Sequence, residues 1–252
     1  MPAIRLLTWN VHRCLGVDGR ISPQRIAEVI AQAAPDVVAL QEVDVLRKRT
    51  GLVDQAEEIA RALGMDSHFH PTVRVLEELY GDAILTIRPS ALMHSGRLPG
   101  RPGLRTIEPR GALWARIDVD GFPLQVVNTH LSLIAHERRT QTDCLLGPEW
   151  IGREDCTGPV ALVGDFNLVP RSNVYRRVTR HMHDAQRAPG MGRPRPTFPA
   201  AFPVLRIDHV FTRGAVLVRS VEVIRNEVTR LASDHLPLVV DLELHDIEDA
   251  PE

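Results

Sequence analysis

Short apolar runs rich in β-branched residues recur along the whole chain, and this pattern limits the possible folds more than any other feature. Runs of this length and composition predict buried β-strands. The strands are expected at residues 4–9, 37–40, 83–87, 112–117, 124–127, 160–163, 207–211, 216–223 and 236–242. Sheets therefore dominate the predicted structure.

Fewer helical patterns separate these strands. Ser22 and Pro23 form an N-cap and first-turn pair before apolar residues at helical spacing, and Pro35 ends that helix. Further helices are expected over residues 52–63, 138–146 and 173–181. Because strands outnumber helices and some strands follow each other directly, the pattern favours a mixed sheet system covered by helices over a strict βαβ repeat.

The composition is that of a soluble globular protein, with 44% hydrophobic and 25% charged residues in a chain of 252. No repeat, low-complexity block or linker divides it, so we expect a single domain over residues 1–252, with 246–252 as a disordered acidic tail. Residues 187–203 are rich in Pro and Gly. They predict a long loop that faces the substrate.

Charge and cysteine usage exclude several classes of protein. A net charge of −2 is not the basic footprint of a strong nucleic-acid binder, and the sequence indicates no protein partner. The three cysteines lack metal-type spacing, which argues against a zinc site or a disulfide framework. Since the sequence has neither a signal peptide nor an apolar run long enough to span a membrane, we expect a cytoplasmic location.

Polar residues stand where the predicted strands end, and side chains so placed can converge on one cleft. Each alone has a structural reading, such as a turn cap, an Asx-turn or an ion-pair partner. Together they are a carboxylate-rich set with carboxamides and no thiolate, which suits Mg²⁺ or Mn²⁺. The set comprises Asn10, Glu42, His130, Asp165, Asn167, Asp208, Asp234 and His235.

The segments LLTWNVH, LQEVD, NTHLS, GDFN, RIDHVF and ASDHLPL follow one another from residue 6 to residue 238. In this order they resemble the successive motifs of the endonuclease/exonuclease/phosphatase superfamily, which includes DNase I, exonuclease III-like repair enzymes and neutral sphingomyelinases. The resemblance implies a four-layered α/β sandwich, in which two mixed β-sheets pack face to face and helices lie outside.

The resemblance also implies roles for the oxygen-bearing residues. Asn10 and Glu42 match ligands of the principal metal ion, and Asp234 matches a ligand that binds it directly or through water. Asp165 and Asn167 match the pair that positions the attacking water, the phosphate or a second metal ion.

By the same resemblance, His235 matches a general base or phosphate-polarising histidine, and Asp208 matches the carboxylate that orients it. His130 matches a histidine that touches a non-bridging phosphate oxygen. The sequence leaves open whether Asp165 or His235 accepts the proton from water. Arg110 in EPRGAL is a candidate substrate-binding residue, with a surface ion pair as the alternative.

Several neighbouring residues are less informative. The family often has asparagine in its YGNAIL-like segment where this chain has Asp82, which loses an amide donor. His209 follows Asp208, but strand alternation turns it to the opposite face. His12 is a candidate for a supporting contact near Asn10.

These features predict a divalent-metal-dependent phosphoesterase in which water attacks in line with the leaving group. EPRGAL and SDHLPLVV resemble sphingomyelinase-like branches, so a lipid headgroup or another small phosphorylated molecule is the favoured substrate. Repair endonucleases of the superfamily commonly carry a lysine soon after the LQE glutamate, whereas this chain has none before Lys48. A DNA or RNA nuclease is the alternative, and a catalytically silent phosphate-binding protein is the third reading.

Overall fold

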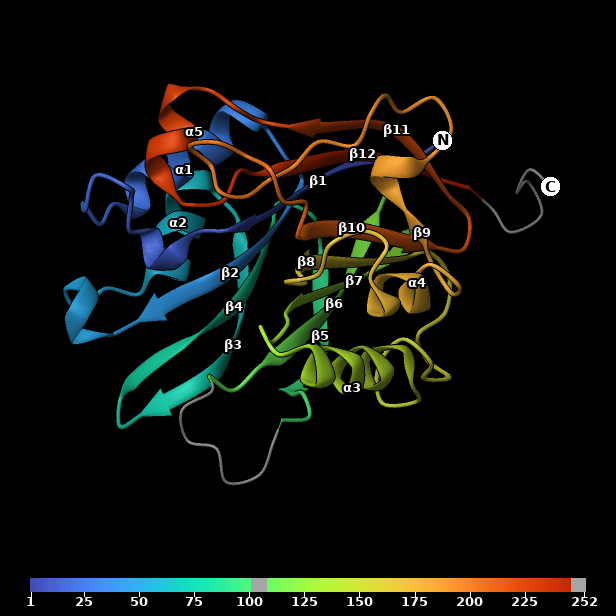
Figure 1. The fold of residues 1–252 in the computed structure, drawn as a ribbon, viewed down its shortest axis with the longest axis horizontal. Helices are drawn as coiled ribbons and strands as arrows, with labels where there is room; N and C mark the ends of the chain where they lie inside the picture. The colour runs from blue at the N-terminus through green and yellow to red at the C-terminus, as the bar shows by residue number, and fades with distance from the viewer. Residues whose placement is uncertain (101–107, 246–252) are drawn as a thin grey trace.

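The computed structural model describes residues 1–100 and 108–245, so the tail expected at 246–252 lies outside the described residues. Two six-stranded sheets pack face to face, and helices cover their outer surfaces (Figure 1). Buried aliphatic residues from both sheets form the central core, among them Leu6, Leu113, Val163 and Val240. The four-layered α/β sandwich expected from the sequence is confirmed.

The first sheet has the strand order β11-β12-β1-β2-β4-β3, and the second has the order β5-β6-β7-β8-β10-β9. Each sheet contains one parallel pair, β1 with β2 and β7 with β8, and the other neighbours are antiparallel. The strands are β1 (Ala3–Asn10), β2 (Val37–Val45), β3 (Asp66–Val75), β4 (Glu78–Thr86), β5 (Ser90–Arg97), β6 (Gly111–Val119), β7 (Phe122–His130), β8 (Val160–Asp165), β9 (His183–Asp184), β10 (Asp208–Arg213), β11 (Val216–Val223) and β12 (Leu238–Leu244).

Helices α1 (Pro23–Ala33), α2 (Gln55–Leu63) and α5 (Glu227–Ala232) pack on the outer face of the first sheet. Helices α3 (Ala135–Leu146) and α4 (Asn173–Val178) pack on the second (Figure 1). Short 3-10 turns occur at His12–Cys14, Lys48–Thr50 and Ala185–Arg187. Within the described residues, no helix is both long enough and apolar enough to cross a bilayer.

Several expected boundaries differ from the observed ones. Helix α2 begins at Gln55 and not at residue 52, because the Asp54 side chain accepts a hydrogen bond from the Glu57 amide and caps the helix there. Helix α3 begins earlier than expected, and α4 ends earlier. Strands β3 and β5 and helix α5 were not predicted. Both strands lie at sheet edges and are partly exposed, so they lack a continuous apolar run.

His209 on β10 lies on the face opposite Asp208, as strand alternation predicted, and points towards the cluster under α3 and α4. Its Nε2 lies 3.0 Å from the Leu168 carbonyl oxygen, and its ring packs against Phe166 and Phe211. Burial, together with the Arg206 charge, lowers the pKa of His209 to about 4. Since an unfolded histidine titrates near 6.5, His209 stabilises the fold above that pH, and this contribution is lost as the pH falls from about 6.5 to about 4.

We expect His209→Gln to flatten the pH dependence of stability. Glutamine retains a donor for the Leu168 carbonyl but does not titrate, so the wild type should lose roughly 3 kcal/mol more than the variant between pH 6.5 and pH 4. Urea unfolding at a series of pH values measures this difference. Parallel pH profiles for the two proteins would contradict the assignment of a neutral, buried imidazole.

Candidate active site

One edge of the sandwich collects the ends of the strands that carry the predicted residues. In the parallel pairs, Asn10 at the end of β1 is level with Gln41, and His130 at the end of β7 is level with Asp165. The antiparallel strand β10 begins at the same edge, where Asp208 pairs with Asp165. Because the sheets pack face to face, these residues from both sheets lie close together.

The Asn10 side chain joins the two sheets. Its Nδ2 donates to Glu42 Oε1 at 2.9 Å and to Asp165 Oδ2 at 3.0 Å, while its Oδ1 accepts from the His12 amide. Asn10 is only 1% exposed, so these hydrogen bonds are formed almost without competition from water. Glu42 and Asp165, which are more than a hundred residues apart in the sequence, therefore both bond to the Asn10 amide.

Unusual backbone conformations position two of the side chains. Glu42 has φ 61° at an irregularity in the pairing of β2 with β4, and Asn167 has φ 48° directly after β8. Positive φ is strained for residues with a side chain and is often found at functional sites.

Gly164, with φ +134°, has no such restriction. A Cβ at Gly164 would lie 1.9 Å from the Thr129 carbonyl oxygen, so only glycine permits this approach of β8 to β7.

Asp208 and His235 form a buried carboxylate-imidazole pair. His235 Nδ1 lies 3.0 Å and 3.2 Å from the two carboxylate oxygens of Asp208. The Thr197 hydroxyl donates to Asp208 Oδ2, and the Phe198 ring packs against His235. Burial opposes a charge on His235, but the carboxylates of Asp208 and Asp165 outweigh it and raise the pKa of the ring to about 10.

Asp165 lies between the two histidines. Its Oδ2 is 3.7 Å from His235 Nε2 and 3.4 Å from His130 Nε2, and its Oδ1 accepts from the Asn167 amide. Burial raises the pKa of Asp165 to about 7, although the charge on His235 opposes the shift. The carboxyl group can therefore change protonation state near neutral pH.

Arg110 contacts His130 at Nδ1, the ring nitrogen that lies away from Asp165. Arg110 Nη1 lies 2.9 Å from His130 Nδ1, and a guanidinium can only donate, so Nδ1 accepts and the ring proton is assigned to Nε2. Burial, helped by the Arg110 charge, lowers the pKa of His130 well below its ordinary value. Arg110 also pairs with Glu108, but its buried Nε has no hydrogen-bond partner among the described residues.

Asp234 lies beside Ser233 and His12, and both of these residues bond to Asn10. Its Oδ1 is 3.4 Å from the Ser233 hydroxyl oxygen and 3.7 Å from His12 Nδ1. The structure therefore brings two of the three expected metal ligands into direct contact and places the third beside His12.

The donor set suits a divalent cation. Asp165, Asp208 and His235 offer ligand atoms that lie within 4.8 Å of one another, and the Asn10 amide links Asp165 to Glu42. Carboxylate and carboxamide oxygens without thiolates match the preference of Mg²⁺ and Mn²⁺. Clustered carboxylates also repel one another, and a cation would relieve that repulsion.

Two nearby residues were missed or left aside by sequence reasoning. Thr197 lies in the Pro-rich loop, where no pattern indicated that its hydroxyl would bind Asp208. Asp82 is 2% exposed, and its Oδ2 has no hydrogen-bond partner among the described residues. Burial raises the pKa of Asp82 well above its ordinary value, and the Arg110 charge opposes that shift.

The chain is similar to known proteins over nearly its whole length. The chain is 26% identical to the Escherichia coli K12 protein YbhP, described as uncharacterized, over 96% of this chain and 97% of that protein. A crystal structure of an endonuclease/exonuclease/phosphatase from Beutenbergia cavernae is 26% identical, with a TM-score of 0.78, and the match covers 97% of this chain and 72% of that one.

Two further structures share the fold at lower identity. A mannosyl-6-phosphatase of Bacteroides thetaiotaomicron is 21% identical with a TM-score of 0.75, covering 96% of this chain and 100% of that chain. The human Nocturnin catalytic domain with bound sulfate is 22% identical with a TM-score of 0.72, covering 97% and 94%. The model of the Endonuclease/Exonuclease/phosphatase family matches residues 7–235. The chain belongs to the endonuclease/exonuclease/phosphatase family.

Proposed function

We propose that this protein hydrolyses a phosphate ester by in-line attack of water, with Mg²⁺ or Mn²⁺ as cofactor. The observation that carries the proposal is the unbroken series of contacts from Glu42 through Asn10, Asp165 and His235 to Asp208. The end of this series at Glu42 and Asn10 supplies ligands for a cation. The other end is the pair of His235 and Asp208, in which the carboxylate orients the ring. A metal ion held by Asn10 and Glu42, with Asp234 directly or through water, would neutralise charge that develops on the phosphoryl and leaving-group oxygens.

The two pKa shifts support a division of work between Asp165 and His235. Burial brings the carboxyl pKa of Asp165 to about 7, which suits a group that accepts a proton from water near neutral pH. Asp208 holds Nδ1 of His235 and favours the charged ring, so Nε2–H can donate to a phosphoryl oxygen. We therefore assign proton transfer to Asp165 and charge stabilisation to His235.

Arg110, His130 and Asn167 are the proposed phosphate-binding group. Arg110 has an unpartnered Nε, and the neutral His130 ring carries its proton on Nε2. Asn167 Nδ2 donates to the Leu131 carbonyl oxygen and lies 3.1 Å from His130 Nε2. Both nitrogens are donors, so they do not bond to each other and each can face a phosphoryl oxygen. Donors held in this way need little rearrangement as negative charge develops on the phosphoryl oxygens.

A small phosphorylated molecule, including a lipid headgroup, is the favoured substrate class. The net charge of −2 argues against strong non-specific binding of nucleic acid. One structural neighbour is a mannosyl-6-phosphatase, which supports a small phosphate ester as substrate.

A nuclease is the second candidate, and one surface favours it. Arg139, Arg176, Arg177 and Arg180 line a hollow of about 320 Å³ between α3 and α4, although Arg177 is paired with Asp143. Such a basic surface could bind a phosphate backbone. Metal-dependent cleavage of plasmid DNA or single-stranded RNA, with no turnover of sugar phosphates, sphingomyelin or phosphatidylinositol phosphates, would favour the nuclease.

We expect EDTA to abolish hydrolysis of bis(p-nitrophenyl) phosphate or p-nitrophenyl phosphate, and Mg²⁺ or Mn²⁺ to restore it. Glu42→Gln and His235→Gln should each lower turnover by about 100-fold or more, because each removes a charged group from the reaction. His209→Gln is the matched control, since it alters a buried histidine on the opposite face of β10 and should retain turnover. Undiminished, metal-dependent turnover in both site variants would refute the assignment, and an inactive wild type would favour a phosphate-binding protein.

Thr197→Val should lower kcat by about 10-fold with little change in KM, because Asp208 loses the hydroxyl donor that fixes its orientation towards His235. Thr197→Ser keeps the hydroxyl and should remain within a few-fold of the wild type. Steady-state kinetics over a range of pH distinguish this positioning role from a loss of stability. Wild-type turnover in Thr197→Val, together with reduced turnover in Thr197→Ser, would show that the threonine methyl group matters and the hydroxyl does not.

A further inference from the structure

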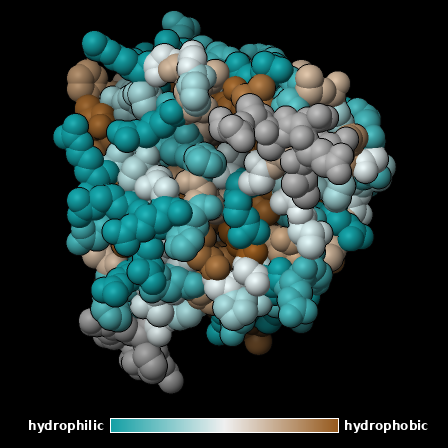
Figure 2. Space-filling view, turned by 90° about the vertical axis from the view of Figure 1, so that its right-hand side faces the viewer, coloured by the Kyte–Doolittle hydropathy of each residue, from teal (hydrophilic) through white to brown (hydrophobic). Residues whose placement is uncertain are grey.

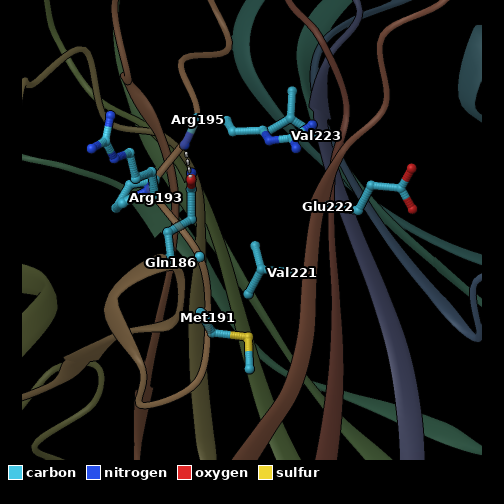
Figure 3. A pocket seen from close by; sticks show the side chains of 9 residues that line it. Gln186, Met191, Arg193, Arg195, Val221, Glu222 and Val223 are labelled. Atoms are coloured by element: carbon cyan, nitrogen blue, oxygen red, sulfur yellow. Dashed lines mark hydrogen bonds between the residues drawn. The ribbon is translucent and has the colours of Figure 1, made fainter.

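A second pocket lies apart from the residues of the candidate active site. Figure 2 shows the side of the molecule that lies at the right in Figure 1, where hydrophobic side chains reach the surface among hydrophilic ones. The pocket has a volume of about 450 Å³, which is suited to a small molecule. Its walls come from the loop after Gln186 and from the end of β11 (Figure 3).

The Gln186 amide is the most informative group in this pocket. Its Oε1 accepts a hydrogen bond from the Arg195 backbone amide at 2.8 Å, which assigns Nε2 as the free end. Gln186 is only 3% exposed, and Nε2 has no hydrogen-bond partner among the described residues. A buried donor without a partner is costly, so an acceptor from a ligand would stabilise it.

The backbone that carries Gln186 is firmly held. The Gln186 amide nitrogen donates to Asp184 Oδ1, and the Arg206 guanidinium binds both carboxylate oxygens of Asp184. The Tyr175 hydroxyl donates to the same carboxylate. Because these partners are buried, the free donor of Gln186 has a fixed position, as a binding site requires.

The charges around the pocket favour an anion. Arg193 and Arg195 line it, and neither has an ion-pair partner in the part of the chain that the structure describes. In Figure 3 the Arg195 side chain reaches towards Val223 on the opposite wall, whereas the Glu222 carboxylate points away from the other side chains. A guanidinium fork and an amide donor together suit a phosphate group.

The rest of the wall is apolar. Met191 and Val221 lie below the Gln186 amide in Figure 3 and would contact the body of a ligand whose anionic head reaches Gln186 and Arg195. We propose that this pocket binds a small organic phosphate, with its phosphate on Gln186 Nε2 and Arg195 and its apolar part on Met191 and Val221. The site is separate from the phosphate-binding group of the active site, and the loop that forms it continues directly to Thr197.

Phenylphosphonate is a suitable probe, since a phosphoesterase does not hydrolyse its carbon-phosphorus bond. Titration calorimetry of the whole protein in EDTA should detect binding without any contribution from metal-dependent catalysis. Gln186→Glu is nearly isosteric and keeps the acceptor for the Arg195 amide, but it replaces the free donor with a negative oxygen. We expect Gln186→Glu and Arg195→Met each to weaken binding by about 10-fold or more.

Arg110→Met is the matched control, because it removes an arginine from the active site and leaves the second pocket intact. It should bind phenylphosphonate as the wild type does. No binding by the wild type at millimolar concentrations, equal binding by every variant, or a loss confined to Arg110→Met would overturn the proposal. Benzoate binding as tightly as phenylphosphonate would overturn the assignment to phosphate. Since the test needs no turnover, its outcome is independent of the proposed function.

Discussion

A pair of buried amides between the sheets fixes the register on which the rest of the structure depends. Gln41 Nε2 on β2 donates to Asn128 Oδ1 on β7 at 2.8 Å, and Asn128 Nδ2 donates to carbonyl oxygens of β2 and β4, both at 2.9 Å. The surrounding contacts are aliphatic and would tolerate sliding, whereas an unpaired buried amide costs about 1–3 kcal/mol. Gln41 directly precedes Glu42, and Asn128 lies just before His130, so the amide pair also sets how closely the two halves of the site approach.

The site concentrates charge in a region with little access to water. Asp165 and Asp208 are both about as buried as core residues, and the charged His235 ring lies between them. In such surroundings each electrostatic interaction is stronger than in water, and so is the repulsion between unneutralised carboxylates. The same arrangement would make a cation and a phosphate bind well together, since the cation offsets the negative charge of the carboxylates and of the phosphate.

The sequence was most informative where function follows from strand position. Asn10, His130 and Asp165 each end a buried strand, so their convergence at one edge of the two sheets could be predicted from the pattern alone. The contact between Asp234 and His12 could not, because both residues lie in irregular segments outside the strands. The contact of Thr197 with Asp208 could not be predicted either, because Thr197 lies in a loop without sequence periodicity and only tertiary contacts fix its position. The edge strands β3 and β5 were missed for a related reason, since their partial exposure removes the apolar run.

The first strand of the chain depends on the last. β1 pairs with β12, the Trp9 indole donates to the His235 carbonyl oxygen, and the Ser233 hydroxyl donates to the Asn10 carbonyl oxygen. During synthesis on the ribosome, the candidate site around Asn10 cannot be complete until residues 233–244 have followed. The contacts that complete the candidate site therefore form only after strands β1 to β11 have been synthesised.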